Sequence, residues 1–196
     1  MKLILATRNA HKVREVGRIL APYGVTVEPL PDRVALPPED GATFVENALP
    51  KARAAADALG RRAIADDSGI EAEALSGGPG VRSARFAGEH ASDEANLAKL
   101  LAEAPTGSGL RYVCALAYVD PALPASEGER IFVGESRGRL SARPRGDRGF
   151  GYDPAFLPDD GPEGLTMAEL DDSDKDAISH RGRALRAFAE WYAKAG

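Results

Sequence analysis

The chain has 196 residues, enough for a sizeable core, and we expect one domain over residues 1–196. Apolar residues make up 43% of it and charged residues 28%, so the composition excludes a mainly disordered or fibrous protein. The formal net charge of −5 argues against a broad nucleic-acid or anionic-membrane surface, but it leaves room for one local site that binds a small polyanion.

The chain also lacks the marks of membrane insertion or export. Its longest unbroken apolar run, Tyr112–Val119, is far shorter than the roughly 20 residues that a membrane helix needs. The short apolar start, Leu3–Ala6, is followed directly by Arg8, so no secretory signal is evident. One cysteine, Cys114, excludes an internal disulfide and a thiolate metal cluster. We therefore expect a cytoplasmic protein.

The first third of the chain alternates between strand and helix patterns. Lys2–Ala6 is typical of a short buried strand, helical spacing of apolar residues follows over Val13–Leu20, and Val25–Val27 can form a second strand. After a proline-rich loop, Thr43 and Glu46 match a helix capping box. Ala48–Leu59 continues that helix, although Pro50 lies inside it and predicts a kink or a break.

Later segments add further strands and helices. Arg62–Ala65 is typical of a strand, Ser92 can cap a helix, and Arg111–Val119 resembles a strand that is covered on both faces. Arg130–Leu140 is its expected partner, and Ser179 can cap a last helix. Interleaved strands and helices, with two strands paired through a short connection, predict an α/β protein with a mixed β-sheet.

Two polar segments follow predicted strands. Thr7-Arg8-Asn9-Ala10-His11-Lys12 lies at a strand-to-helix junction, where backbone N–H groups attract phosphate; the alternative is an ordinary helix N-cap with surface cations. Asp66-Asp67-Ser68 follows the strand Arg62–Ala65, and neighbouring carboxylates on an extended chain point to opposite sides. One of them could hold Mg²⁺ or orient a water; the alternative is a turn before Gly69.

Two further segments lie near the C-terminus. The aromatics of Gly149-Phe150-Gly151-Tyr152-Asp153-Pro154 could stack on a nucleobase, or they could pack in a tight turn. Lys175 is the one cation in an acidic stretch, Asp159–Asp176, that otherwise predicts a solvated loop, and Ser179-His180-Arg181 follows it at a helix start.

Taken together, these segments resemble the inosine/xanthosine triphosphate pyrophosphatase family, which removes non-canonical nucleotides from the nucleotide pool. The matching stretches occur in family order from Thr7 to Leu185: Thr7–Lys12, Thr43–Ala52, Ala65–Ile70, Pro79–Arg85, Gly149–Pro154 and Ser179–Gly182. Each stretch alone could arise by chance, whereas the ordered set is specific.

The resemblance implies an α/β fold of two lobes around a long mixed β-sheet, with a substrate cleft between the lobes, usually in a homodimer. It implies Mg²⁺-dependent hydrolysis of a small-molecule nucleoside triphosphate (ITP, dITP or XTP) to the monophosphate and pyrophosphate. Asp67 would be general base and metal ligand, and Glu39 the second metal ligand, with Asp40 as its rival. The resemblance implies a substrate site formed by Thr7, Arg8, Asn9, Ala10, His11, Lys12, Ser68, Phe150, Gly151, Tyr152, Asp153, Lys175, His180 and Arg181.

Three residues depart from the family pattern: Arg8 and Arg148 stand where glycine is common, and Pro50 interrupts a helix. Arg181 is our candidate for reading the base, because a guanidinium has donors only and would accept a purine 6-carbonyl but not adenine's 6-amino group. Two alternatives stay open: a Maf-like nucleotide pyrophosphatase with a different base preference, and a nucleotide-binding sensor without turnover.

Overall fold

The computed structural model describes residues 1–195, without the side chain of Ala195. The chain divides into two compact units, which we describe separately. Unit 1 comprises Met1–Asp67, Cys114–Gly134 and Arg181–Gly196, and unit 2 comprises Ser68–Val113 and Glu135–His180. The prediction of a single domain over residues 1–196 stays a prediction.

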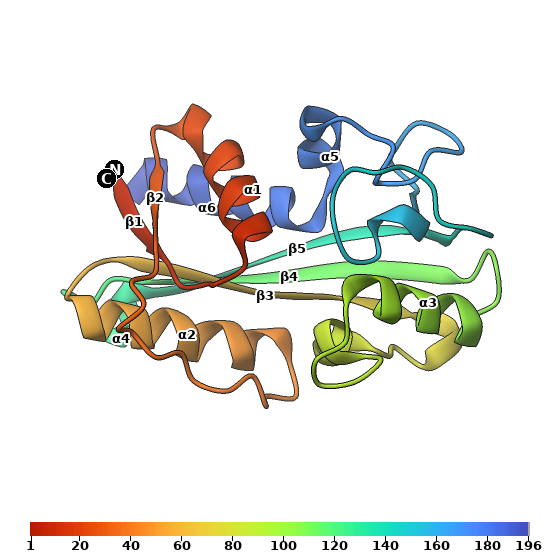
Figure 1. The fold of residues 1–196 in the computed structure, drawn as a ribbon. Coiled ribbons are helices and arrows are strands. Elements are labelled where there is room, and N and C mark those ends of the chain that lie inside the picture. Colours follow the sequence, from red (N-terminus) through yellow and green to blue (C-terminus); the bar gives the residue numbers. More distant parts are fainter. Residues whose placement is uncertain (196) are drawn as a thin grey trace. The chain divides into compact units, whose positions relative to one another are not determined.

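The secondary structure interleaves helices and strands along the chain (Figure 1). The helices are α1 (Ala10–Leu20), α2 (Phe44–Leu59), α3 (Asp93–Glu103), α4 (Ala125–Gly128), α5 (Asp172–Ile178) and α6 (His180–Ala195). The strands are β1 (Lys2–Leu5), β2 (Thr26–Pro29), β3 (Ala63–Ala72), β4 (Gly109–Val119), β5 (Glu129–Leu140) and β6 (Phe156–Pro158).

Within residues 1–195 these strands form a six-stranded sheet in the order β2-β1-β3-β4-β5-β6. The strand β1 pairs in parallel with β2 and with β3, whereas β5 pairs antiparallel with β6. The sheet is therefore mixed, and the predicted α/β class is confirmed. No helix within the described part of the chain is long and apolar enough to cross a membrane.

Unit 1 packs helices on both faces of its strands, with α1 and α6 on one side and α2 on the other (Figure 1). Side chains from β1, β3 and β4 join those of α1 and α6 in one core cluster, which includes Leu5, Val16, Ile64, Leu116 and Phe188. Four alanines make up much of the buried face of α2: Ala48, Ala52, Ala55 and Ala56. Alternation along β3 sends Ile64 toward α1 and α6, and it sends Ala63 and Ala65 toward α2.

The predicted capping box is present at the start of α2. Thr43 accepts a hydrogen bond from the Glu46 N–H at 3.2 Å, and the Glu46 carboxylate accepts the Thr43 N–H at 3.0 Å. The helix continues through Pro50 to Leu59, so the alternative of a break at Pro50 is wrong. Burial of the alanine face offsets the hydrogen bond that proline removes.

The strand β3 differs from the prediction in length. It does not end before Asp66 but runs on to Ala72, so the alternative of a turn before Gly69 is also wrong. Both aspartates are buried within the strand, at 1% exposure for Asp66 and 6% for Asp67. Buried carboxylates persist in a strand only where cations or donors compensate them, and these partners come from distant segments.

Unit 2 contains the helix capped by Ser92, whose hydroxyl accepts the Ala95 N–H at 3.2 Å, as predicted. The acidic stretch is only partly a loop. Asp171 caps α5 by accepting the Asp174 N–H at 2.8 Å, and this short helix carries Lys175 into a buried position.

Candidate active site

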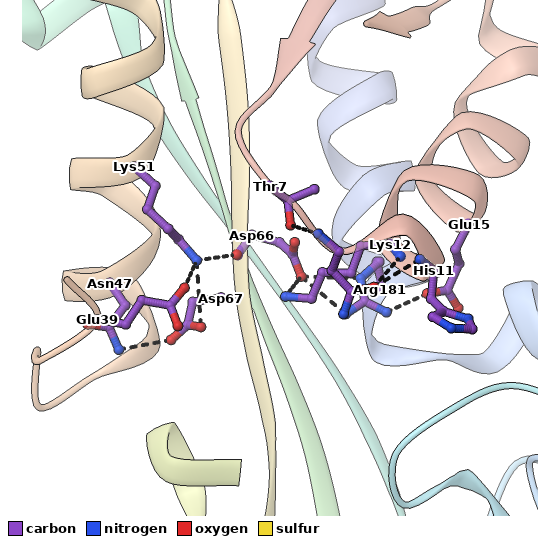
Figure 2. Close-up of polar contacts among 11 residues, drawn as sticks. Thr7, His11, Lys12, Glu15, Glu39, Asn47, Lys51, Asp66, Asp67 and Arg181 are labelled. Carbon is purple, nitrogen blue, oxygen red and sulfur yellow. Dashed lines mark hydrogen bonds and ion pairs between the residues drawn. The ribbon is translucent and has the colours of Figure 1, made fainter. Parts of the chain in front are cut away.

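Asp66 and Asp67 lie next to each other on β3 and point to its two faces, as the sequence predicts (Figure 2). Asp66 points toward Lys12 and Glu15 of α1 and toward Arg181 of α6. Asp67 points the other way, toward the start of α2 and the loop before it. One strand therefore supplies carboxylates to two separate polar clusters of unit 1.

The Asp66 cluster brings carboxylates and cations together in pairs. Asp66 Oδ2 lies 2.9 Å from the Lys12 ammonium and accepts two bonds from the Arg181 guanidinium, at 3.2 and 3.1 Å. Arg181 also donates to the Glu15 carboxylate. Glu15, Asp66 and Arg181 are all less than 5% exposed. Two carboxylates and two cations balance here, which is the condition for burying such groups.

Electrostatics favour the ionised form of Asp66. Burial alone would raise its pKa, but the nearby charges of Lys12, Arg181 and Lys51 outweigh burial and hold the pKa well below its usual value. Burial alone would lower the pKa of Arg181, but the charges of Glu15 and Asp66 outweigh burial, and the pKa is raised. Asp66 and Arg181 therefore keep their charges throughout the neutral range, and the Asp66 carboxylate orients Lys12.

The Asp67 cluster is compensated less completely. The Asn47 amide donates to Asp67 Oδ2 at 3.0 Å, and the Lys51 ammonium lies 3.8 Å from Asp67 Oδ1. Lys51 donates to the Glu39 carboxylate and, at 2.8 Å, to the Asp66 backbone carbonyl. One ammonium thus stands between two carboxylates, Glu39 and Asp67 (Figure 2).

The pKa of Asp67 is raised, in contrast to that of Asp66. Burial is the main cause and Glu39 adds to it, while Lys51, Asn47 and Lys12 act in the opposite direction. The pKa of Lys51 is also raised, because the carboxylates Asp66, Asp67 and Glu39 outweigh its burial. An additional cation beside Asp67 would therefore stabilise its ionised carboxylate.

These residues fit a magnesium ion. Mg²⁺ is usually held by one or two carboxylates together with waters and substrate phosphates. Glu39 and Asp67 supply two carboxylates that converge on one cation, and residues 1–195 contain no larger group of metal-binding side chains. The structure favours Glu39 over its rival because Asp40 is exposed while Glu39 reaches the Lys51 ammonium.

The start of α1 contains the predicted phosphate-binding segment. Asn9 is the N-cap: its side-chain oxygen accepts the N–H groups of His11 at 2.9 Å and Lys12 at 3.2 Å. Thr7 in turn accepts the Asn9 N–H at 3.2 Å. Asn9 is therefore a helix N-cap, as the alternative interpretation predicts, and its side-chain oxygen binds two of the N–H groups at the helix start. Ala10 is exposed, and the His11 ring contacts Arg14 at 2.9 Å.

Arg8 has a structural task that the sequence did not indicate. Its guanidinium donates to the Asp32 carboxylate at 3.0 Å, to the Asp32 carbonyl at 3.2 Å and to the Val34 carbonyl at 3.0 Å. Asp32 and Val34 begin the loop that later carries Glu39. The side chain where glycine is common in the family thus ties the α1 junction to that loop.

Unit 2 gathers a second group of predicted residues. Asp153, which is 3% exposed, accepts bonds from the Lys175 ammonium at 2.8 Å, the Phe150 N–H at 2.9 Å and the Tyr112 hydroxyl at 3.1 Å. Lys175 also lies 5.2 Å from the Phe150 ring centre. Gly149 has φ +74°, and a Cβ there would lie 2.2 Å from Asp153. The turn therefore needs glycine to approach this buried pair.

The remaining predicted residues of unit 2 differ in exposure. Tyr152 is buried and donates its hydroxyl to the Ser83 carbonyl at 2.7 Å, so only Phe150 of this segment's two aromatics is partly open for stacking. Gly151 donates its N–H to Asp93 at 2.9 Å. His180 stacks on Tyr112 with ring centres 4.5 Å apart. Ser68 is half-buried on β3.

Three residues of the unit 1 clusters were missed as site residues: Glu15, Asn47 and Lys51. For Asn47 and Lys51 a signal existed, because residues four apart share a helix face and both are polar on a face whose other members are apolar. Glu15 gave a weaker signal, since it interrupts the apolar pattern of α1 between Val13 and Val16.

Comparison with known proteins gives one consistent family. Residues 3–191 match the model of the Ham1 family. A protein of Frankia alni named dITP/XTP pyrophosphatase is 50% identical over 96% of this chain and 96% of its own. A protein of the same name from Mycolicibacterium paratuberculosis is 50% identical over 94% of this chain and 92% of its own.

Solved structures agree with this result. The HAM1 protein of Coxiella burnetii superposes with a TM-score of 0.86 at 36% identity, over 99% of each chain. The nucleoside-triphosphatase, or dITP/XTP pyrophosphatase, of Mycobacterium abscessus gives a TM-score of 0.71 at 42% identity, over 96% of this chain and 98% of that one. These matches confirm the resemblance found in the sequence, and the chain belongs to the Ham1 family.

Proposed function

We propose that this protein hydrolyses non-canonical purine nucleoside triphosphates (ITP, dITP and XTP) to the monophosphate and pyrophosphate. The observation that carries the proposal is the arrangement of Asp67, Glu39 and Lys51 in unit 1, beside a buried cluster that orients Lys12. The names of the relatives support the substrate class. Neither a Maf-like base preference nor a sensor without turnover has a specific observation in its favour.

Release of pyrophosphate requires water to attack the α-phosphorus, and negative charge grows on the phosphoryl oxygens as it does so. Catalysis then rests on positioning and on electrostatic stabilisation of that charge. Asp67 is the candidate to orient the water and take its proton, because its carboxylate accepts only one neutral hydrogen bond among residues 1–195. Lys12, held by Asp66, supplies a fixed positive charge for the phosphates.

Glu39 and Asp67 would hold the Mg²⁺. When bound, the ion would neutralise phosphate charge and keep the neighbouring carboxylate ionised. Lys51 would then share the Glu39 and Asp67 carboxylates with the ion, and it keeps its bond to the Asp66 carbonyl. Before the ion binds, the Lys51 ammonium would reduce the repulsion between the half-exposed Glu39 carboxylate and the buried Asp67 carboxylate.

In unit 2, Phe150 and Lys175 are the candidates for contacts with the nucleotide. The Phe150 residue is partly exposed. The Lys175 ammonium lies 5.2 Å from the Phe150 ring centre and donates a hydrogen bond to Asp153 at 2.8 Å. Arg181 remains the candidate that reads the purine 6-position. Its guanidinium also donates to Glu15 and Asp66, so these two carboxylates would set the orientation in which it meets the base.

A substrate panel tests the proposal. Purified protein is given ITP, dITP, XTP, GTP and ATP with Mg²⁺, and pyrophosphate and monophosphate are measured separately. We expect kcat/KM for the three deaminated purines to exceed that for ATP and GTP by at least about 10²-fold. Hydrolysis in ¹⁸O-labelled water should place the label in the monophosphate.

Three outcomes would contradict the proposal: release of inorganic phosphate instead of pyrophosphate, equal rates for ATP and ITP, or binding of ITP without turnover. Chelation of the metal should abolish hydrolysis, and added Mg²⁺ should restore it. The homodimer and the cytoplasmic location that the resemblance implies stay predictions, and sedimentation analysis of the purified protein would check the first.

A further inference from the structure

Asn47 is a buried polar side chain to which the proposed function assigns no task. Its side chain lies on α2, and the residue is 2% exposed. The amide donates to Asp67 Oδ2 at 3.0 Å, and the amide oxygen accepts the Gly41 N–H at 2.8 Å. Both ends of one rigid, planar group are therefore occupied, one by β3 and the other by the loop before α2.

The two hydrogen-bond partners of Asn47 belong to the two segments that carry the proposed metal ligands, Asp67 and Glu39. One partner is Asp67 itself, and the other is the backbone two residues after Glu39. Among residues 1–195, Asn47 is the one group that donates a hydrogen bond to the Asp67 carboxylate. The strand period sends Asp67 to this face, and the amide then fixes the orientation of its carboxylate and anchors the end of the loop that carries Glu39.

The approach of the loop to the amide is close. A Cβ at Gly41 would lie 2.7 Å from the Asn47 oxygen and 2.7 Å from the Glu46 Cβ, so a larger residue would push the loop or the amide aside. The backbone at Gly41 does not have the positive φ that requires glycine. Close approach to Asn47 is the reason that a glycine suits this position.

We propose that Asn47 is a positioning residue that fixes Asp67 and the Glu39 loop relative to each other, so that the two carboxylates can hold one divalent cation. The inference rests on the proposed function, whose metal pair it concerns. Reacting groups that move by about 1 Å lose roughly 10²-fold in rate, so a lost positioning bond should affect turnover more than substrate affinity.

The chain offers a matched control in unit 2. Asn96 is also 2% exposed and is also the fourth residue of its helix, α3. Its oxygen accepts a loop N–H, that of Ala87 at 2.7 Å, just as Asn47 accepts that of Gly41. Its amide, however, donates to a backbone carbonyl, that of Ala84 at 3.1 Å, and to no carboxylate.

The test compares Asn47→Ala with Asn96→Ala in the full chain. Both variants leave a loop N–H in a part-buried hydrogen bond without its acceptor, so both should lower the melting temperature by similar amounts. Only Asn47→Ala should weaken Mn²⁺ binding to the nucleotide-free protein, by at least about 10-fold in a titration followed by electron paramagnetic resonance. With saturating Mg²⁺, it should also lower kcat for ITP by about 10²-fold while KM changes less than about three-fold.

A second variant keeps the test valid if Asn47→Ala does not fold. Gly41→Ala leaves Asn47 intact but displaces it, and it should reproduce the weaker Mn²⁺ binding and the lower kcat. Gly17→Ala on α1 is its control, because a Cβ there would meet Val27 at an ordinary 3.7 Å.

The proposal is overturned if Asn47→Ala and Gly41→Ala bind Mn²⁺ as tightly as wild type, if Asn96→Ala weakens Mn²⁺ binding equally, or if wild type binds no Mn²⁺. These results do not depend on the substrate. A wild-type protein that binds Mn²⁺ but hydrolyses none of the deaminated purines would refute the proposed function, whereas the Mn²⁺ titrations would still decide the role of Asn47.

Discussion

The two faces of β3 place neighbouring carboxylates in opposite electrostatic surroundings. On one face, Asp66 binds two cationic side chains, Lys12 and Arg181, and its pKa is lowered. On the other face, Asp67 accepts one bond from the neutral Asn47 amide and shares the Lys51 ammonium, and its pKa is raised.

This difference separates the two roles that a buried carboxylate can take. A carboxylate whose charge is balanced by neighbouring cations stabilises the fold and orients those cations. A carboxylate with incomplete compensation gains from an added cation, which suits a metal ligand and a base that orients water. We therefore assign the first role to Asp66 and the second to Asp67.

The largest expected effect is that of Asp67→Asn on turnover. The amide cannot take a proton and is a poorer metal ligand, so kcat for ITP should fall by about 10³-fold or more. The unfolding free energy should not decrease, because the raised pKa shows that the fold disfavours this ionised carboxylate. Steady-state kinetics and urea unfolding on one preparation check both, and near-normal turnover would rule out the proposed base.

Asp66→Asn should act mainly on stability. Removing the carboxylate takes one anionic partner from the buried Arg181 and from the partly buried Lys12, which should cost about 3–5 kcal/mol in the free energy of unfolding at pH 7.

The pH dependence of this loss follows from the pKa of Asp66. The pKa is lower in the fold, so the stabilisation is fully present above the usual value of 3.8 and disappears as the pH falls through the folded-state value. The gap in unfolding free energy between wild type and variant should therefore shrink below about pH 4. A gap that stays constant in acid unfolding experiments would contradict this account of Asp66.

The choice between Glu39 and Asp40 can be tested by a pair of substitutions on one loop. Glu39→Gln should raise the Mg²⁺ concentration for half-maximal activity by about 10-fold or more, because it removes one of the two carboxylates that we propose hold the metal. Asp40→Asn should leave that concentration close to the wild-type value, since the Asp40 residue is exposed. The reverse order in a Mg²⁺ titration would assign the ligand to Asp40.

Arg181, the proposed reader of the base, lies on the Asp66 face. Arg181→Ala should narrow the preference for ITP over ATP, expressed as the ratio of kcat/KM values, by about 10-fold. It should also destabilise the protein, because Glu15 and Asp66 lose their shared partner. Arg181→Lys keeps the positive charge and serves as the control for folding. An unchanged ratio in both variants would reject Arg181 as the base reader.

The smallest expected effect is that of Arg8→Ala. The Arg8 side chain is 49% exposed, so its bond to Asp32 should contribute less than about 1 kcal/mol. Because its contacts tie down the loop, KM for ITP at saturating Mg²⁺ should change much less in Arg8→Ala than in Lys12→Ala. Equal increases in KM would instead place Arg8 among the phosphate contacts.

Local signals in the sequence were sufficient for most of the fold. The Thr43–Glu46 capping box, the apolar spacing of α1 and the Ser92 cap depend on residues a few positions apart, and all three are present in the structure. The opposite directions of Asp66 and Asp67 follow from the two-residue period of a strand.

The failures have a common physical origin in long-range compensation. The strand β3 continues through two aspartates because partners such as Arg181, 115 residues from Asp66, neutralise charge that would otherwise favour a turn. Lys175 is buried because Asp153, 22 residues away, pairs with it. The task of Arg8 depends on carbonyl groups in a loop that has no sequence signal for it.

The most direct test of the contrast between the two faces of β3 is a Mn²⁺ titration of nucleotide-free Asp66→Asn and Asp67→Asn, followed by electron paramagnetic resonance. We expect Asp67→Asn to weaken Mn²⁺ binding by at least about 10-fold and Asp66→Asn to change it by less than about three-fold, at a temperature where both variants are folded. Equal losses, or a larger loss in Asp66→Asn, would contradict the assignment of the metal to the Asp67 face.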